Sequence, residues 1–338
     1  MTTAGNTPPS PEPPALRRTE AVPELAGLAP GGVLFTARAL EAGWTRRQLH
    51  HRLRQGQWQP LAHGAWAAPG RRIDWFTRAW AVQTLQPNLV CSHRTAAALH
   101  RLELLHGPAQ EVYAEAEFTD PRPGPYRSRP GTRIHRSPLT PADRTVRRSL
   151  RVTSPARTVG DLMRQLPRNE AVVVADSALS ARRVHGVRRP PLLPLRALHA
   201  ELAHPRRGAT RARTLLPLLD PASASPTETV TRLLFHDAGL RPETQALLRT
   251  PTGLCLRPDF FFRAEGLVVE IEGYAFHGTR EAHTEDLRRF NELQGCPEIR
   301  RILRFTATDV YRHPKRVLAE IVTALQALRA LRVPESWE

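Results

Sequence analysis

Three acidic residues interrupt apolar stretches in which charged side chains are rare. Asp259 precedes Phe260-Phe261-Phe262, and two glutamates, Glu270 and Glu272, lie in the later run Leu267-Val268-Val269-Glu270-Ile271-Glu272. Successive side chains of a β-strand point to opposite faces, so both glutamates share one face and the apolar residues 267, 269 and 271 lie on the other. Two carboxylates are therefore expected on a single strand face.

The connection between the two apolar runs is short. Ala264-Glu265-Gly266 is compatible with a hairpin that places Asp259 beside the two glutamates. Carboxylates that lie so close together cannot all stay ionised unless a cation binds between them or one of them is protonated. We favour a cation, because oxygen ligands suit hard divalent ions such as Mg²⁺ or Mn²⁺, which assist hydrolysis at phosphorus.

Most of these acidic residues could also have a purely structural role. Ser225-Pro226-Thr227-Glu228 forms a complete capping box for a following helix. Asp259 suits the entry of a strand, Glu272 suits a strand end in solvent, and Asp286 and Arg289 suit a solvated ion pair on a helix. Glu270 is harder to explain in this way, because an unpaired buried carboxylate costs roughly several kcal/mol.

The acids belong to a longer pattern that runs from Ser225 to about Leu325. Its parts are Ser225-Pro226-Thr227-Glu228, the expected strand pair with Asp259 and Glu270, Tyr274-Ala275-Phe276-His277, Asp286-Leu287-Arg288-Arg289, Ile302-Leu303-Arg304-Phe305-Thr306 and Asp309-Val310. This pattern resembles the PD-(D/E)xK nuclease superfamily, and within it the branch related to very-short-patch-repair endonucleases.

The resemblance implies an α+β domain ordered αβββαβ, with a divalent metal between the acids and a hydrolysed phosphodiester as product. It implies catalytic positions at Glu228, Asp259, Glu270, Glu272 and His277, and metal ligation by Asp259, Glu270 and the backbone of Ile271. Glu228 is an alternative to Glu270 in the metal shell.

One departure from the superfamily affects the mechanism. The lysine usually found two residues after the second acid is replaced by Glu272, and the chain contains a single lysine, Lys315, far downstream. That lysine ordinarily steadies developing charge in the reaction. The branch resembled here implies that His277 takes over as a general acid or base. The role of Glu272 stays open between metal binding, water activation and a solvent-facing position.

The N-terminal region is expected to bind DNA. Residues 1–30 are rich in proline and suggest a mobile tail, and folded structure is expected to begin at Val33. Helices are expected over 35–42 and 46–54, the second with Leu49 and Leu53 on one face, followed by a two-stranded wing over 58–66. Leu34-Phe35-Thr36, Ala42-Gly43-Trp44-Thr45 and residues 61–66 resemble the winged-helix domain of AbiEi-type antitoxins. The resemblance places DNA contacts on the second helix, at Arg46, Arg47, His50, Arg52 and Arg54. A basic solvated face is the alternative.

Charge supports a nucleic-acid partner for this region. The formal net charge is +17, and residues 1–220 carry 33 basic against 16 acidic residues, whereas residues 221–338 carry 16 of each. Electrostatic affinity for DNA is therefore expected in the N-terminal two thirds. Arginine supplies 48 of the 49 basic residues, a bias that coding composition can also produce.

The domain boundaries follow from these patterns. We expect a tail over 1–30, a winged helix over 31–70, an antitoxin-like α/β middle region over 71–185, a helical connection and linker over 186–224, loose at Asp220–Ala224, and an endonuclease-like domain over 225–338. In the middle region, Ser154-Pro155-Ala156-Arg157-Thr158 fits the antitoxin resemblance. His93 is expected in the first turn of a helix capped by Ser92, with a core or capping role.

The remaining features narrow the class of protein. No apolar run or signal peptide is expected to direct the chain to a membrane, and Cys91, Cys255 and Cys296 lack metal spacing, which indicates buried thiols in a reducing cytoplasm and no zinc site. We predict a cytoplasmic, Mg²⁺- or Mn²⁺-dependent endonuclease acting on DNA, with RNA as a less favoured substrate. The alternative is a non-enzymatic DNA-binding regulator or antitoxin with an inactive nuclease fold; homodimerisation and a partner toxin are left open.

Overall fold

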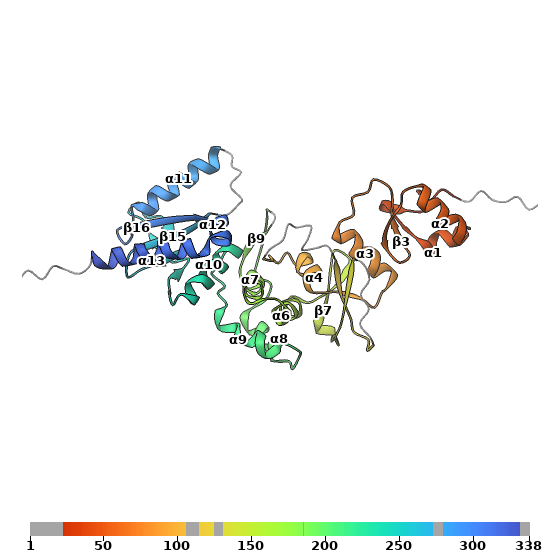
Figure 1. The fold of residues 1–338 in the computed structure, drawn as a ribbon, viewed down its shortest axis with the longest axis horizontal. Coiled ribbons are helices and arrows are strands. Elements are labelled where there is room, and N and C mark those ends of the chain that lie inside the picture. Colours follow the sequence, from red (N-terminus) through yellow and green to blue (C-terminus); the bar gives the residue numbers. More distant parts are fainter. Residues whose placement is uncertain (1–22, 106–114, 125–130, 185, 273–279, 332–338) are drawn as a thin grey trace, which may run out of the picture. The chain divides into compact units, whose positions relative to one another are not determined.

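The computed structural model of the protein describes residues 23–105, 115–124, 131–184, 186–272 and 280–331. The fold is α+β, as predicted, with helices and several small sheets (Figure 1). The chain divides into two compact units, residues 1–85 and residues 86–338, which are described separately. No helix in the described part of the chain is both long enough and apolar enough to cross a bilayer.

The first unit is a helix-turn-helix followed by a hairpin. Its elements are η1 (Pro30–Gly32), β1 (Val33–Phe35), α1 (Thr36–Glu41), α2 (Arg46–Gln55), β2 (Gln59–Ala62), β3 (Ala65–Ala67) and α3 (Trp75–Leu85), with the sheet ordered β1-β3-β2. Thr45 and Gln48 form a complete capping box at the start of α2. Leu49 and Leu53, four residues apart, are buried on one face of α2. The opposite face of α2 is therefore left to solvent.

Two expected boundaries of this unit move. Folded structure begins before Val33, because Leu25 and Ala29 are buried in the core with α2 and the Trp44 indole donates to the Pro23 carbonyl at 3.0 Å. Residues 71–85 also belong here, since Ala81 on α3 is buried with the strands of the wing. Both boundaries are set by apolar contacts between residues far apart in the sequence, which the amino-acid composition does not reveal.

The second unit opens with an α/β region. Its elements are β4 (Val90–Cys91), α4 (His93–Leu99), β5 (Ala116–Asp120), β6 (Thr132–Arg136), η2 (Pro141–Asp143), β7 (Arg144–Arg147), β8 (Leu150–Thr153), α6 (Pro155–Gln165), α7 (Arg168–Leu179), β9 (Arg182–Val184), β10 (Val187–Arg189), α8 (Leu195–Ala203), α9 (Ala209–Thr214) and η3 (Leu216–Leu218). A five-stranded sheet is ordered β6-β5-β4-β8-β7, and α6 and α7 form the centre of an apolar core.

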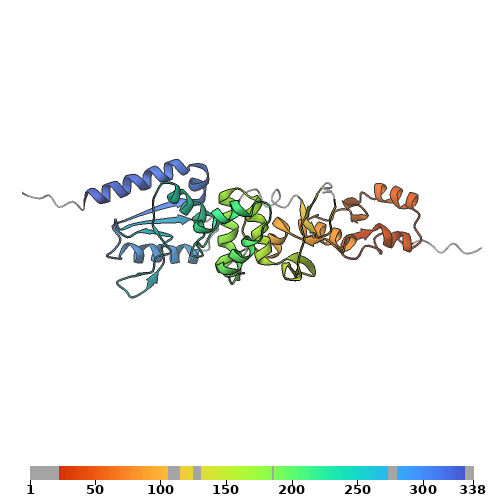
Figure 2. The same ribbon diagram turned by 90° about the horizontal axis from the view of Figure 1, so that it is seen from below.

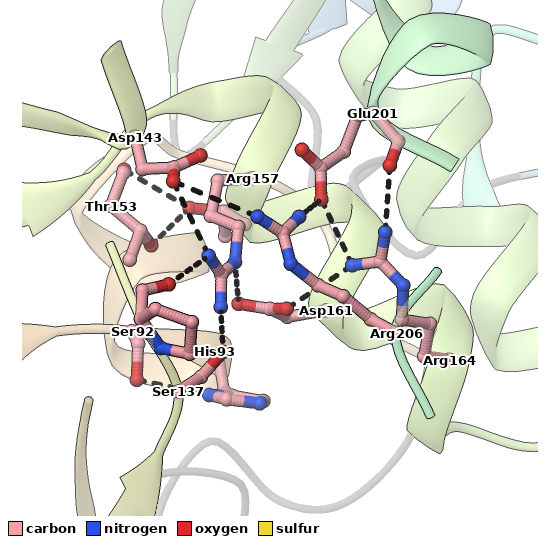
Figure 3. Close-up of polar contacts among 12 residues, drawn as sticks. Ser92, His93, Ser137, Asp143, Thr153, Arg157, Asp161, Arg164, Glu201 and Arg206 are labelled. Atoms are coloured by element: carbon pink, nitrogen blue, oxygen red, sulfur yellow. Dashed lines mark hydrogen bonds and ion pairs between the residues drawn. The ribbon is translucent and has the colours of Figure 1, made fainter. Parts of the chain in front are cut away.

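Arg157 on α6 is buried in a polar network (Figure 3). Its Nε donates to Asp161 Oδ2 at 2.7 Å, Nη2 donates to Ser137 Oγ at 2.7 Å, and Nη1 donates to the Pro138 carbonyl at 3.0 Å. Arg164 continues the network from Asp161 to Glu201, whose Oε1 lies 2.9 Å from Arg164 Nη1. The Arg157 guanidinium thus joins α6 to the segment that follows β6.

Replacing Arg157 by methionine is expected to lower the free energy of unfolding by about 3–5 kcal/mol, because the buried partners of the guanidinium lose their donors. The change is measured by urea unfolding of the full chain. Arg168→Met is the control, since Arg168 pairs with Asp237 on the exposed surface, and a loss of at most about 1 kcal/mol is expected there. Equal losses in the two variants would contradict a structural role for the network.

The segment 186–224 contains the helices α8 and α9, as expected of a helical connection, but it is packed and not a loose linker. Leu198, Leu202 and Ala212 from this segment are buried in the core of the α/β region. At its end, Ser223 is buried and the Asp220 amide donates to Asp176 Oδ1 at 2.9 Å. The proline- and arginine-rich composition suggested a loose chain, but these contacts order it.

Asp176 on α7 also joins the α/β region to the C-terminal elements. It accepts hydrogen bonds from Thr229 Oγ1 at 3.0 Å and from Arg232 Nη2 at 2.7 Å. Burial raises the pKa of Asp176 to about 6, although the charge of Arg232 opposes the rise. Residues 86–338 consequently form one unit in which the expected middle region and nuclease-like domain share an interface.

The C-terminal elements surround a four-stranded sheet ordered β11-β14-β15-β16. They are α10 (Pro226–Asp237), β11 (Glu243–Thr244), β12 (Leu248–Arg249), β13 (Cys255–Leu256), β14 (Phe260–Phe262), β15 (Leu267–Glu272), α11 (Arg280–Gln294), β16 (Arg301–Thr306), α12 (Ala307–Arg312) and α13 (Pro314–Ala330). Apart from the small β12–β13 pair, the order is αβββαβ followed by two helices, which is the order that the resemblance implied.

Both faces of this sheet are covered, as Figures 1 and 2 show. Leu267 and Val269 pack with α13, whereas Val268 packs with Leu293 of α11. The predicted alternation of β15 is therefore confirmed, and Glu270 emerges on the face that α11 covers. Of the three cysteines, Cys91 and Cys296 are buried as expected, but Cys255 is exposed.

Candidate active site

The β14–β15 hairpin brings Asp259 and Glu270 together. The two strands pair antiparallel, with Phe260 opposite Val269. Asp259, just before β14, accepts a hydrogen bond from the backbone amide of Ile271 through Oδ2 at 2.7 Å. Since Ile271 follows Glu270 directly, this bond holds the Asp259 carboxylate at the point where the Glu270 side chain leaves the sheet.

Glu228 reaches the same place from α10. The side-chain amide of Gln245 donates to Glu228 Oε2 at 3.1 Å and to Asp259 Oδ1 at 3.0 Å, so one amide bridges the two carboxylates. The predicted capping box is only half formed: Ser225 Oγ accepts from the Glu228 amide, whereas Glu228 Oε2 accepts from the Ala224 amide at 2.8 Å. Glu228 therefore serves both the helix start and the carboxylate cluster.

Glu270 is 8% exposed and has incomplete compensation. Arg289 Nη2, on α11, lies 3.2 Å from Glu270 Oε1, but among the described residues no donor is aligned to make a hydrogen bond to this buried oxygen. A cavity of about 140 Å³ opens beside it, lined by Asp259, Glu270 and Arg289 together with Asp286 and Arg304. A buried carboxylate oxygen whose contact with Arg289 is an ion pair and not an aligned hydrogen bond, facing a cavity, fits the ligand set of a divalent cation.

Glu272 lies outside the buried cluster. Its carboxylate is 44% exposed, and Oε1 pairs with Arg304 Nε of the adjacent strand β16 at 2.8 Å. Arg304 also lies over the Phe290 ring at 5.2 Å, which fixes its direction. The structure thus brings together Glu228, Asp259 and Glu270, and places Glu272 at the rim of the cavity as the partner of an arginine.

His277 and Lys315 are the remaining residues that bear on the mechanism. His277, the expected proton-transfer residue, lies outside the described residues. Lys315 is exposed near the start of α13 and is absent from the residues lining the cavity. Within the described structure, the guanidinium nearest the buried carboxylates belongs to Arg289. An ion pair with Asp286 was the structural alternative for this residue, but its guanidinium contacts Glu270.

Burial and mutual repulsion raise the pKa values of the acids in the carboxylate cluster. Burial raises the pKa of Glu228 to about 7, and the charge of Asp259 adds to the rise. The same two causes, in the same order, raise the pKa of Glu270 to about 7. Burial also raises the pKa of Asp259, although the Ile271 amide opposes the rise. Without a cation, the folded protein therefore holds protons here that the unfolded chain releases.

This proton uptake predicts a pH dependence of stability. In EDTA, the contribution of Glu228 and Glu270 to the free energy of unfolding should fall as pH rises from about 4.5 to about 7, because the folded state binds more protons over this window. The expected loss is on the order of a few kcal/mol, and a divalent cation should reduce it by stabilising the ionised cluster.

The measurement compares urea unfolding of the wild type with the Glu228→Gln and Glu270→Gln double variant across this pH range. The variant should gain stability over the wild type as pH rises, since its amides do not ionise. A constant difference between the two proteins from acidic to neutral pH would show that the cluster does not bind protons on folding.

The predicted DNA-contact residues occupy a separate surface, on α2 of the first unit. Arg46, Arg47, His50, Arg52 and Arg54 are all exposed, as expected. Among the described residues, none of these four guanidinium groups has an ion-pair or hydrogen-bond partner in the protein. His51, which we did not predict, shares a face with Arg47 and Arg54 through its spacing on the helix.

Two residues of the carboxylate cluster were missed by sequence reasoning. Gln245 has a backbone φ of 54°, a strained conformation for a residue other than glycine, and it reaches the cluster through the pairing of β11 with β14. Arg289 was part of the predicted motif Asp286-Leu287-Arg288-Arg289, but the only individual role considered for it was an ion pair on the helix surface. The motif containing Arg289 could have suggested a site role, whereas no local signal marks Gln245.

Comparison with known proteins gives relatives without an assigned activity. No family model matches the chain. Two proteins of Mycobacterium tuberculosis, Uncharacterized protein MT2308 and Uncharacterized protein Rv2248, are each 30% identical to this chain over 184 residues. The match covers 52% of this chain and 62% of each relative, so the chain spans less than two thirds of their length.

Proposed function

We propose that the protein is a metal-dependent endonuclease that hydrolyses phosphodiester bonds in DNA in the cytoplasm. The observation that carries the proposal is the convergence of Glu228, Asp259 and Glu270 beside a cavity, with one buried Glu270 oxygen lacking a hydrogen-bond donor among the described residues. Three carboxylates with incomplete compensation lower stability, which is a common cost of a functional site.

Asp259 and Glu270, with the backbone of Ile271, would hold Mg²⁺ or Mn²⁺, and Glu228 would join them directly or through water. When bound, the cation supplies Lewis-acid stabilisation of charge on a phosphate oxygen. Gln245 holds Asp259 and Glu228 at a fixed separation through its bridging amide. The Ile271 amide fixes the second oxygen of Asp259, so the ligand directions are set before a substrate arrives.

The positive charge that a lysine supplies in the superfamily is assigned here to Arg289. Its Nη2 donates to the Arg257 carbonyl at 2.9 Å while it contacts Glu270, so the guanidinium is held at the cavity. A guanidinium in this position can stabilise charge that develops on the phosphate. Proton transfer is assigned to His277, as the resemblance implies. Glu272, paired with Arg304, is assigned no chemical step.

The arginines of α2 supply the affinity for DNA in this proposal. Their exposure and the surplus of basic residues in residues 1–220 support electrostatic binding to phosphates. The C-terminal segment, with balanced charge, would contribute the chemistry rather than the binding energy. Substitutions should therefore be able to remove DNA binding without removing cleavage, and cleavage without removing DNA binding.

A panel of substrates tests the function. The purified protein is incubated with supercoiled plasmid, a mismatch-bearing duplex and single-stranded RNA, in Mg²⁺, in Mn²⁺ and in EDTA. Cleavage of a DNA substrate only with a divalent cation is expected. Cleavage of RNA but of neither DNA substrate would indicate a ribonuclease and contradict the proposed DNA substrate. Cleavage that persists in EDTA would exclude the metal-dependent mechanism.

A non-enzymatic DNA-binding regulator or antitoxin is the second candidate. The pairing of Glu272 with Arg304 favours it, because the position usually occupied by the catalytic lysine serves a surface ion pair here. This candidate predicts salt-sensitive DNA binding without cleavage of any of the three substrates, and DNA affinity that does not change when Asp259 is replaced.

A further inference from the structure

A second group of potential ligands lies in the second unit, outside the carboxylate cluster. His93 at the start of α4, Glu117 on β5 and His135 on β6 each offer one ligand atom, and these atoms lie within 4.8 Å of one another. His135 Nε2 is 2.9 Å from Glu117 Oε2, and the His93 and His135 rings are stacked with centroids 3.6 Å apart.

The fold brings these side chains together from three segments. β5 and β6 pair in parallel, with Thr119 opposite His135, and strand alternation puts Glu117 and Thr119 on the same face. The Glu117 amide donates to Thr95 Oγ1 of α4 at 2.8 Å, which holds α4 against β5. His93 has a backbone φ of 49°, which costs roughly 1 kcal/mol or more in a residue other than glycine. Tertiary packing therefore sets the position of its ring.

The hydrogen bonds of His93 identify the nitrogen available to a metal ion. Gln165 Nε2 lies 2.9 Å from His93 Nε2, and since an amide nitrogen only donates, His93 Nε2 is the acceptor. The ring proton then lies on Nδ1, 2.9 Å from Ser92 Oγ. Ser92 thus bonds the ring and not the helix start, which corrects the predicted capping role. A neutral imidazole that donates its other N–H to an oxygen is the form that binds metals.

The polar groups around these side chains favour a cation. Gln165, at the end of α6, is exposed and can move aside without disturbing the core. In the described part of the chain, the guanidinium that pairs with the buried Glu117 carboxylate is that of Arg94, whose Nη1 is 3.7 Å from Glu117 Oε1. Thr119 Oγ1 is buried on the same strand face and has no hydrogen-bond partner among the described residues. A hydrated cation would compensate the carboxylate and give this hydroxyl a partner.

We propose that His93, Glu117 and His135 bind a divalent transition-metal ion of the Zn²⁺ type. Two imidazoles and one carboxylate suit such an ion and leave one position open, whereas Mg²⁺ prefers oxygen ligands. Bonds of about 2.0–2.2 Å place the ligand atoms of a tetrahedral ion roughly 3.3 Å apart, so the stacked rings must turn until their ligand nitrogens converge on the ion. The two clusters of this protein would then select different ions, and the proposal is independent of the nuclease function.

The test is a zinc-binding titration of the full-length protein after removal of metals, in competition with a chromophoric chelator. The wild type should bind one equivalent that His135→Gln loses or binds at least about 100-fold more weakly. His199→Gln, a substitution of an exposed histidine on α8, should bind as the wild type does. Asp259→Ala should also keep this equivalent, which separates the site from the carboxylate cluster.

A second measurement does not depend on the folding of a variant. X-ray absorption at the zinc edge of the wild type loaded with one equivalent should show two imidazole ligands. Fewer than two imidazoles would overturn the proposal. Equal zinc affinity in the wild type, His135→Gln and Glu117→Gln would overturn it as well, because removal of a proposed ligand would then leave zinc binding unchanged.

Discussion

Replacing Asp259 by alanine is expected to lower the rate of metal-dependent DNA cleavage by at least about 10³-fold, since loss of a metal ligand removes several kcal/mol of transition-state stabilisation. Asp259 is the residue through which the cluster is organised: it bonds the Ile271 amide and shares the Gln245 amide with Glu228. The rate is measured under single-turnover conditions on supercoiled plasmid.

The matched control is Glu243→Gln. Glu243 lies on β11 in the same sheet, but its carboxylate is exposed and pairs with Arg263. The Glu243→Gln variant should cleave DNA at a rate within about twofold of the wild-type rate. An exposed ion pair contributes at most about 1 kcal/mol to stability, and this one does not contact the cavity. If Asp259→Ala and Glu243→Gln cleave at similar rates, the carboxylate cluster is not the catalytic site.

Replacing Arg46, Arg47, Arg52 and Arg54 together by glutamine is expected to weaken binding of the full chain to duplex DNA by at least about 10²-fold near physiological salt. Each lost phosphate contact should also reduce the slope of log affinity against log salt by about 0.9. Both quantities come from fluorescence anisotropy at several salt concentrations. Cleavage at saturating protein should be retained, since these residues lie on α2 and not at the cavity.

The control for this experiment removes the same charge elsewhere. Arg249, Arg301, Arg312 and Lys315 are exposed in the charge-balanced segment 221–338. Replacing these four residues by glutamine should reduce the affinity for DNA far less than the α2 substitutions do. Most of the slope of log affinity against log salt should also remain. An equal loss in both quadruple variants would mean that net charge, and not the α2 surface, determines binding.

Patterns within one segment of sequence predicted the structure well. The alternation of residues 267–272 and the short 264–266 connection predicted the β14–β15 hairpin, and the spacing of Leu49 and Leu53 predicted the buried face of α2. Both are local periodicities that a single element must satisfy. The αβββαβ order came from the resemblance and matches the observed elements.

Features that depend on distant contacts were not predictable in this way. Gln245 reaches the cluster because β11 pairs with β14, and its positive φ has no sequence signature. The His93, Glu117 and His135 group depends on the parallel pairing of β5 with β6, and no local spacing in the sequence indicates it. Segment 186–224 has the composition of a linker, yet the burial of Leu198 and Leu202 orders it.

The central claim is that the buried carboxylates would bind a divalent cation that the protein needs to hydrolyse DNA, and Glu270→Gln tests it most directly. This substitution keeps the size of the side chain and removes the charge of the oxygen that lacks a hydrogen-bond donor in the described structure. Nicking of supercoiled plasmid in Mg²⁺ should be lost while DNA affinity stays at the wild-type value. Nicking by Glu270→Gln at the wild-type rate, or no cleavage by the wild type in either Mg²⁺ or Mn²⁺, would contradict the claim.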